Sequence, residues 1–133
     1  MSLNWATPGH NHVSEYQQSG VPFVTSSLAS TSTSPIKVEF PYVTKFVNVI
    51  HNGASGTTVK VGFTENGVNG VGGNHFFTLT PGTQTGNMEV KCTELWILSS
   101  ASTATWSLVA GITNVPVKNF FVVSGSNGVE GVG

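Results

Sequence analysis

The residues best suited to metal chemistry are two histidines near the N-terminus. His10 and His12 are separated by one residue, so their imidazoles lie on the same side of an extended segment. Glu15 or His51 could complete a zinc or nickel site with them. Histidines in such a segment also donate hydrogen bonds or stack on aromatic rings such as that of Trp5. We expect the second kind of role, and therefore no metal site and no cofactor.

Nucleophilic catalysis is the second chemistry that the residue types allow. Serine, histidine and glutamate are present, and glutamate can replace aspartate in a catalytic triad. However, the chain contains no Gly-x-Ser-x-Gly sequence of the kind that holds a nucleophilic serine. Its single cysteine, Cys92, alternates with Val90 and is expected to be a small buried hydrophobic residue. We therefore expect that the protein is not an enzyme.

Charged residues are scarce and come from two residue types. Of 133 residues, which make one domain, five are Lys and six are Glu, with neither Asp nor Arg. Asp-rich calcium loops and bidentate Arg contacts are therefore excluded, and a net charge of −1 gives no positive field for nucleic acid. No stretch approaches the ~20 apolar residues of a membrane-spanning helix. The charges are spread singly, and we expect them not to gather into a site.

Strands must position whatever site exists, because strand patterns dominate the chain. Alternation of apolar and polar residues predicts seven strands, at 36–40, 42–50, 57–64, 75–80, 87–92, 95–98 and 104–110, and an eighth at 21–25. Turn residues separate them at intervals of about 8–12 residues, which is typical of an antiparallel β-sandwich. Eight strands in two sheets is the count of a single jelly roll. The one helical turn that we expect lies at 14–18.

The predicted organisation is a sandwich with an extension at each end. We expect an extended N-terminal arm at 1–35, a sandwich core at 36–112, and a tail at 113–133 that combines an apolar strand with a Gly-rich end. An unpaired Phe-Phe-Val-Val segment would be prone to aggregation, so we expect it to pair within its own sheet or with a neighbouring copy. The candidate assembly contacts are the aromatic and histidine residues of the two extensions: Trp5, His10, His12, Tyr16, Phe120 and Phe121.

Aromatic side chains also allow glycan binding, because β-sandwiches can stack sugars on exposed rings. Trp96 and Trp106 lie on predicted strands, so we expect both in the core. Trp5 is the best exposed candidate, although it can equally anchor the arm to a neighbour.

The arm carries a resemblance to a known class of proteins. Its segments 4–13, which read NWATPGHNHV, and 19–25, which read SGVPFVT, resemble the start of short structural proteins of phages and large aquatic viruses. The rest of the chain is similar in general terms to single jelly-roll capsid proteins, including small penton proteins. The resemblance implies a virion structural protein, a minor capsid or penton subunit that assembles in the host cell with copies of itself and other capsid proteins.

Two alternatives to this expectation stay open. One is a decoration or cement protein that stabilises the joints between major capsid proteins. The other is a carbohydrate-binding sandwich on a viral fibre or spike, with a glycan as its partner. In each case a surface so poor in charge is poorly suited to a free monomer, so the protein is expected to be covered largely by its neighbours.

Overall fold

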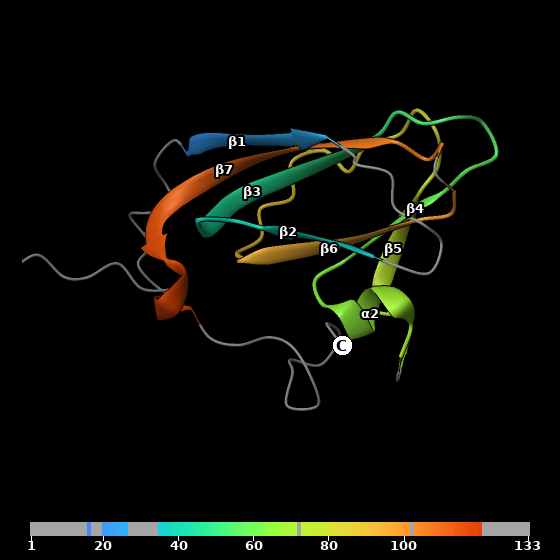
Figure 1. Cartoon of the computed structure of the whole chain (residues 1–133). Helices are drawn as coiled ribbons and strands as arrows, with labels where there is room; N and C mark the ends of the chain where they lie inside the picture. Colours follow the sequence, from blue (N-terminus) through green and yellow to red (C-terminus); the bar gives the residue numbers. More distant parts are fainter. Residues whose placement is uncertain (1–15, 17–19, 27–34, 72, 102, 121–133) are drawn as a thin grey trace, which may run out of the picture.

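Two antiparallel sheets pack against each other as a β-sandwich (Figure 1). The structure is a computed structural model that describes residues 16, 20–26, 35–71, 73–101 and 103–120. The expected all-β class and antiparallel sandwich are confirmed. Within the described ranges, no helix is long and apolar enough to cross a membrane.

Seven strands form the two sheets. The three-stranded sheet has the order β1 (Val21–Ser26), β7 (Trp106–Pro116), β3 (Tyr42–His51). The four-stranded sheet has the order β2 (Ile36–Glu39), β6 (Glu94–Ser99), β4 (Val59–Gly62), β5 (Phe76–Leu79). A short helix, α2 (Glu65–Asn69), connects β4 to β5, and a 3-10 turn, η1 (Val117–Asn119), follows β7. β1 thus lies within the predicted arm, and β7 continues past residue 112, the predicted end of the core.

The segment 83–92 runs beside the free edge of β3 without forming a regular strand. Val47 and Met88 exchange backbone hydrogen bonds of 2.9 and 2.8 Å, and a second isolated bridge joins Ile50 to Gln84. Gly86 lies between the two bridges with a φ of 69°, a backbone conformation that interrupts a regular ladder. The strand predicted at 87–92 is therefore an irregular edge segment.

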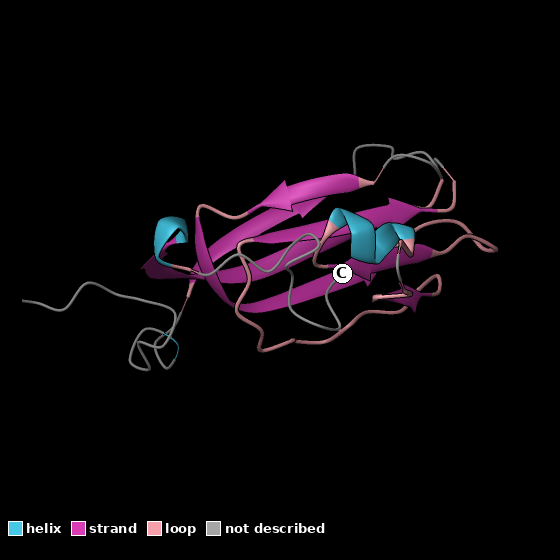
Figure 2. Ribbon diagram, turned by 90° about the horizontal axis from the view of Figure 1, so that it is seen from below, coloured by secondary structure: helices cyan, strands magenta, loops and turns pink. Residues whose placement is uncertain are grey.

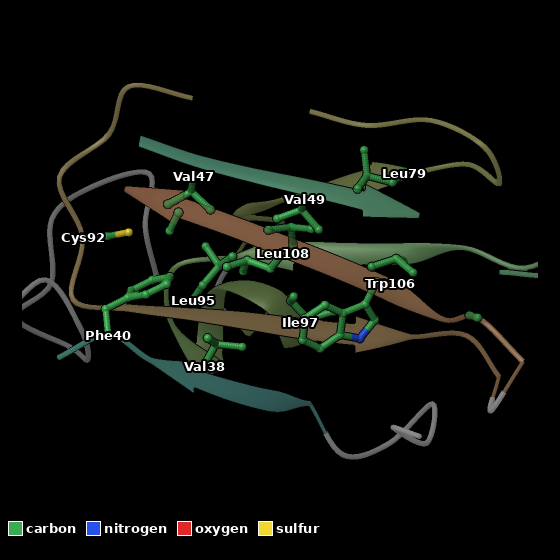
Figure 3. Close-up of a cluster of buried hydrophobic side chains, with 14 of the residues drawn as sticks. Val38, Phe40, Val47, Val49, Leu79, Cys92, Leu95, Ile97, Trp106 and Leu108 are labelled. Carbon is green, nitrogen blue, oxygen red and sulfur yellow. The ribbon is translucent and has the colours of Figure 1, made fainter. Parts of the chain in front are cut away.

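The core lies between the inward faces of the two sheets. Its fully buried members include Val47 and Val49 from β3, Leu108 from β7, and Leu95 and Ile97 from β6 (Figure 3). These residues alternate with half-buried or exposed ones along each strand, because successive side chains of a strand point to opposite faces. The alternation that predicted the strands therefore also builds the core.

We expected both strand tryptophans in this core, but only one of them is buried there. Trp106 is buried as expected, at 2% exposure. Trp96 is half-buried because its neighbours Leu95 and Ile97 both point inward, so its own side chain must point outward. The run from Leu95 to Leu98 is apolar on both faces, and its pattern did not reveal which face is buried.

Helix α2 was not expected from the sequence. It begins after Thr64, whose Oγ1 accepts a hydrogen bond from the Gly67 amide at 2.9 Å, and it ends at Gly70 with a φ of 75°. Its Val68 is fully buried and packs over Gly62 of β4, where an added Cβ would lie 3.1 Å from the Val68 side chain. Seen from below, α2 lies over the strands of the sandwich (Figure 2).

The Thr44 hydroxyl fastens the segment 83–92 to β3. Thr44 is fully buried, and its Oγ1 donates to the Val90 carbonyl at 2.8 Å and accepts from the Cys92 amide at 3.1 Å. Replacing this hydroxyl by a methyl group would leave two main-chain groups without these partners, which typically costs about 1–3 kcal/mol for each buried group.

We therefore expect Thr44→Val to lower the free energy of unfolding by about 2–4 kcal/mol. The matched variant Thr44→Ser keeps the hydroxyl and loses one methyl group, so it should cost only about 1 kcal/mol. Urea unfolding followed by tryptophan fluorescence measures both variants. Equal losses would show that the hydroxyl is not what holds the segment.

Candidate functional site

The structure describes two of the six predicted assembly residues. Tyr16 and Phe120 lie within the described ranges, and the others lie outside them: Trp5, His10, His12 and Phe121. Tyr16, the described residue of the predicted turn at 14–18, lies in a helical turn and is half-buried. Its ring lies 4.5 Å from the Lys91 ammonium, a cation–π distance. Tyr16 therefore contacts the segment 83–92.

Phe120 lies at the same end of the sandwich. It is half-buried after η1, and its amide donates to the Val117 carbonyl at 3.0 Å. Pro116, at the end of β7, pairs with Tyr42, the first residue of β3. Lys91, which contacts Tyr16, precedes Cys92. The Cys92 carbonyl accepts a hydrogen bond from the Thr44 amide, near the same end of β3. The two described candidates thus mark one end of the three-stranded sheet.

His51 cannot complete a metal site with the N-terminal histidines. It is fully buried, and its Nδ1 accepts a hydrogen bond from the Gly53 amide at 3.0 Å. The ring therefore carries its proton on Nε2, which lies 3.3 Å from the Thr57 carbonyl and donates to it. Both nitrogens are used inside the core. Within the described ranges, no three His, Cys or Glu side chains are grouped as metal ligands.

Cys92 is a buried thiol, as expected. Its side chain packs in the core at 4% exposure, with Sγ 3.3 Å from Thr44 Oγ1. Burial raises the pKa of Cys92 to about 11, and the contact with Thr44 opposes this shift only in part. The thiol is therefore protonated at neutral pH and inaccessible to a substrate.

The outer face of the four-stranded sheet carries a cluster of charges. Lys37 Nζ lies 2.7 Å from Glu39 Oε1 and 3.1 Å from Glu94 Oε2, and hydrogen bonds to Glu39 and then Glu94 raise the pKa of Lys37. Trp96 Nε1 donates to Glu94 Oε1 at 3.3 Å. The expectation that the charges do not gather was wrong for these residues, because the pairing of β2 with β6 brings them together. Lys37 and Glu39 are exposed and Glu94 is half-buried. Their ion pairs help to hold β2 beside β6.

Nine residues on the outer face of the three-stranded sheet are uncharged. Strand pairing places them in three rows across β1, β7 and β3: Pro22, Gly111 and Phe46; Val24, Val109 and Asn48; Ser26, Ser107 and Ile50. We call these nine residues the neutral face. Charged residues border the neutral face. Lys45 is half-buried beside Phe46, at the irregularity where the β3 register shifts, and Glu89 and Lys91 lie exposed in the segment 83–92 along β3.

Polar groups of the neutral face are paired with neutral partners. Ser26 Oγ and Ser107 Oγ are 3.2 Å apart, and Asn48 Nδ2 donates to Gln84 Oε1 at 3.2 Å. The Phe46 ring covers Gly111, where an added Cβ would lie 2.5 Å from the ring. The face is therefore preorganised, and a neighbour could cover it without desolvating a charge.

β1 forms an exposed edge of this sheet. Within the described residues it pairs with β7 alone, and its Val21 and Val24 are 62% and 66% exposed. Pro22 lies in this edge strand and has no amide hydrogen to donate. The neutral face and this edge together form the candidate assembly surface.

Comparison of the chain with models of protein families, with curated proteins and with solved structures finds no match.

The raised pKa of Cys92 predicts a loss of stability at alkaline pH. The unfolded thiol ionises near its ordinary pKa of 9.0, whereas the folded thiol keeps its proton up to about 11. The stabilisation is present below pH 9 and is lost as pH rises towards 11, because the unfolded state then binds fewer protons. Two pKa units correspond to about 3 kcal/mol.

We expect the free energy of unfolding of the native chain to fall by about 2–3 kcal/mol more than that of Cys92→Ala between pH 8 and pH 11. Urea unfolding under reducing conditions at several pH values measures this difference. Parallel curves for the two proteins would contradict the assignment of a raised pKa to this thiol.

Proposed function

We propose that the protein is a structural component of a virion, a minor capsid or penton subunit that acts by packing rather than by catalysis. The observation that carries this proposal is the neutral face, a preorganised group of nine uncharged residues next to an exposed edge strand. Its partners are copies of itself and other capsid proteins. We expect the protein to be located in the assembled virion.

We infer further that the strands follow the order of a single jelly roll, a fold used by viral capsid proteins and also by lectins and cupins. Two features support this inference. If the segment 83–92 is counted as the eighth strand, the sheets read β1-β7-β3-(83–92) and β2-β6-β4-β5. With this segment counted as a strand between β5 and β6, the chain also changes sheet at every connection except β4 to β5. Because the fold serves several functions, the neutral face carries the functional proposal.

The chemistry of the neutral face favours a second protein surface as its partner. Covering a charge removes water from it at a cost of several kcal/mol, and this face requires no such step. A neighbour would instead bury exposed apolar side chains such as Val24, at about 25 cal/mol for each Å². A second copy of the chain offers a surface of the same neutral kind.

The size of the neutral face favours a lattice of several contacts. Three strands about 4.8 Å apart, each presenting every second residue over about 17 Å, cover on the order of 200–300 Å². A stable pairwise interface covers about 800 Å² on each partner. The neutral face must therefore act together with other contacts, for which the arm at 1–35 and the tail at 113–133 are the proposed sources.

We expect a charge on the neutral face to prevent self-association. Val24→Lys places an ammonium where a neighbour would have to cover it, and should weaken association at least tenfold. The matched control Thr78→Lys places the same charge on an exposed position of β5, and should leave association unchanged. Sedimentation velocity over a range of concentrations measures both. A native chain that stays monomeric throughout, or equal effects of the two variants, would contradict the proposal.

Deletion of residues 1–19 tests the contribution of the arm. The deletion removes Tyr16 and its contact with Lys91 but leaves every strand of the sandwich. We expect circular dichroism and cooperative unfolding of the sandwich to be retained, while assembly into particles is lost. Native mass spectrometry of the assembled chain then separates the roles, since a ring of five supports a penton and a trimer supports a decoration protein.

A further inference from the structure

A hollow of about 250 Å³ lies beside β4 and β5, remote in sequence from the strands of the neutral face. It is lined by one residue of β4, two of β5 and three of the connection between them. These are Val61, then Phe76 and Phe77, then Phe63, Asn74 and His75. The connection through α2 joins the two strands at this end. The volume is slightly below the ~300–1,000 Å³ of sites for drug-sized ligands, so it suits a single small ring.

The aromatic rings of the hollow are held in place by the core. Phe63 and Phe77 pack against the core cluster and remain half-buried, so each keeps part of its ring accessible. Phe76 precedes Phe77 on β5 and points to the opposite face of the strand, where the Lys60 ammonium lies 4.7 Å from its ring centroid. Rings that are fixed before binding lose little freedom when a ligand stacks on them.

The two polar residues of the hollow lack hydrogen-bond partners among the described residues. Neither the Asn74 amide nor the His75 imidazole makes a hydrogen bond to any described part of the chain. The polar residues of the neutral face differ, since Asn48 and Ser107 are bonded to neighbouring side chains. An amide both donates and accepts, and so does a neutral imidazole. Asn74 and His75 therefore present the complementary groups that hydroxyls require.

The lining residues include no Lys or Glu, and Lys60, which lies beside the hollow, is engaged with the Phe76 ring, so we expect a neutral ligand. The matching ligand has an apolar face for the rings and several neutral hydroxyl groups at its edge. Sugars in the pyranose form have both features, because their axial C–H groups form an apolar face and their hydroxyls point outward. A purely apolar ligand would leave Asn74 and His75 unused.

We propose that this hollow is a binding site for a neutral pyranose, which stacks on the rings of Phe63 and Phe77 and hydrogen-bonds to Asn74 and His75. The site is distinct from the neutral face and does not depend on the assembly role. It also differs from the glycan hypothesis based on Trp5, because its residues come from β4, β5 and their connection.

Saturation-transfer NMR on the full chain tests the site with glucose, galactose and N-acetylglucosamine, because this method tolerates large assemblies and millimolar affinities. We expect saturation of the ring protons of at least one of these sugars. Asn74→Ala should weaken its binding about fivefold, the usual effect of one lost hydrogen bond. The matched control Asn114→Ala removes another exposed asparagine, on β7, and should leave binding unchanged.

A second variant tests the stacking contact. Phe63→Leu keeps an apolar side chain in the core but removes the ring, so binding should fall more than fivefold while the melting temperature is largely retained. If Phe63→Leu does not fold, the binding measured for Asn74→Ala, a change at an exposed position, still tests the proposal.

Three outcomes would overturn the proposal. One is the absence of saturation for all three sugars at 50 mM. Another is preference for a carboxylated sugar such as sialic acid, which would contradict a neutral ligand. The last is full competition by cyclohexanol together with unchanged binding in Asn74→Ala, which would indicate an apolar hollow without sugar recognition.

Discussion

The pairing of β3 with β7 supports the rest of the sandwich. These are the two longest strands, and each uses its other edge to hold a further segment: β1 lies against β7, and the segment 83–92 lies against β3. The inward residues of the pair, including Val47, Val49 and Leu108, form one wall of the core on which the four-stranded sheet packs. The outward residues of the same pair form most of the neutral face, so core and candidate assembly surface share one ladder.

The sequence predicted the strands well, because alternation follows from the geometry of a strand between core and solvent. Alternation did not predict features that it does not encode, such as the buried face of a wholly apolar run or a short capped helix. The run from Leu95 to Leu98 is apolar on both faces, so its pattern did not show that Trp96 points outward. Helix α2 is too short for a helical period, and its signal is the pair of caps, Thr64 and Gly70.

The candidate sites were harder to predict because they depend on which strands are neighbours. Val24 and Phe46 belong to one surface only because β7 lies between β1 and β3. The cluster around Lys37 likewise requires the register that brings Glu94 beside β2. Composition indicated that charge is rare but not that Lys37, Glu39 and Glu94 gather on one outer face while the nine residues of the neutral face carry none. No property of the linear chain reveals this difference in charge between the two faces.

Pro22 has a consequence for how growth of an assembly would end. An edge strand with a complete set of amide donors can template another strand, that strand a third, and the product is a fibre of indefinite length. Pro22 leaves the edge strand β1 with one amide donor fewer, which would weaken this open-ended addition. Contacts through sheet faces can instead be related by rotation and can close on themselves. In the proposed assembly, a single imino acid would thus favour a particle of finite size over an unlimited polymer.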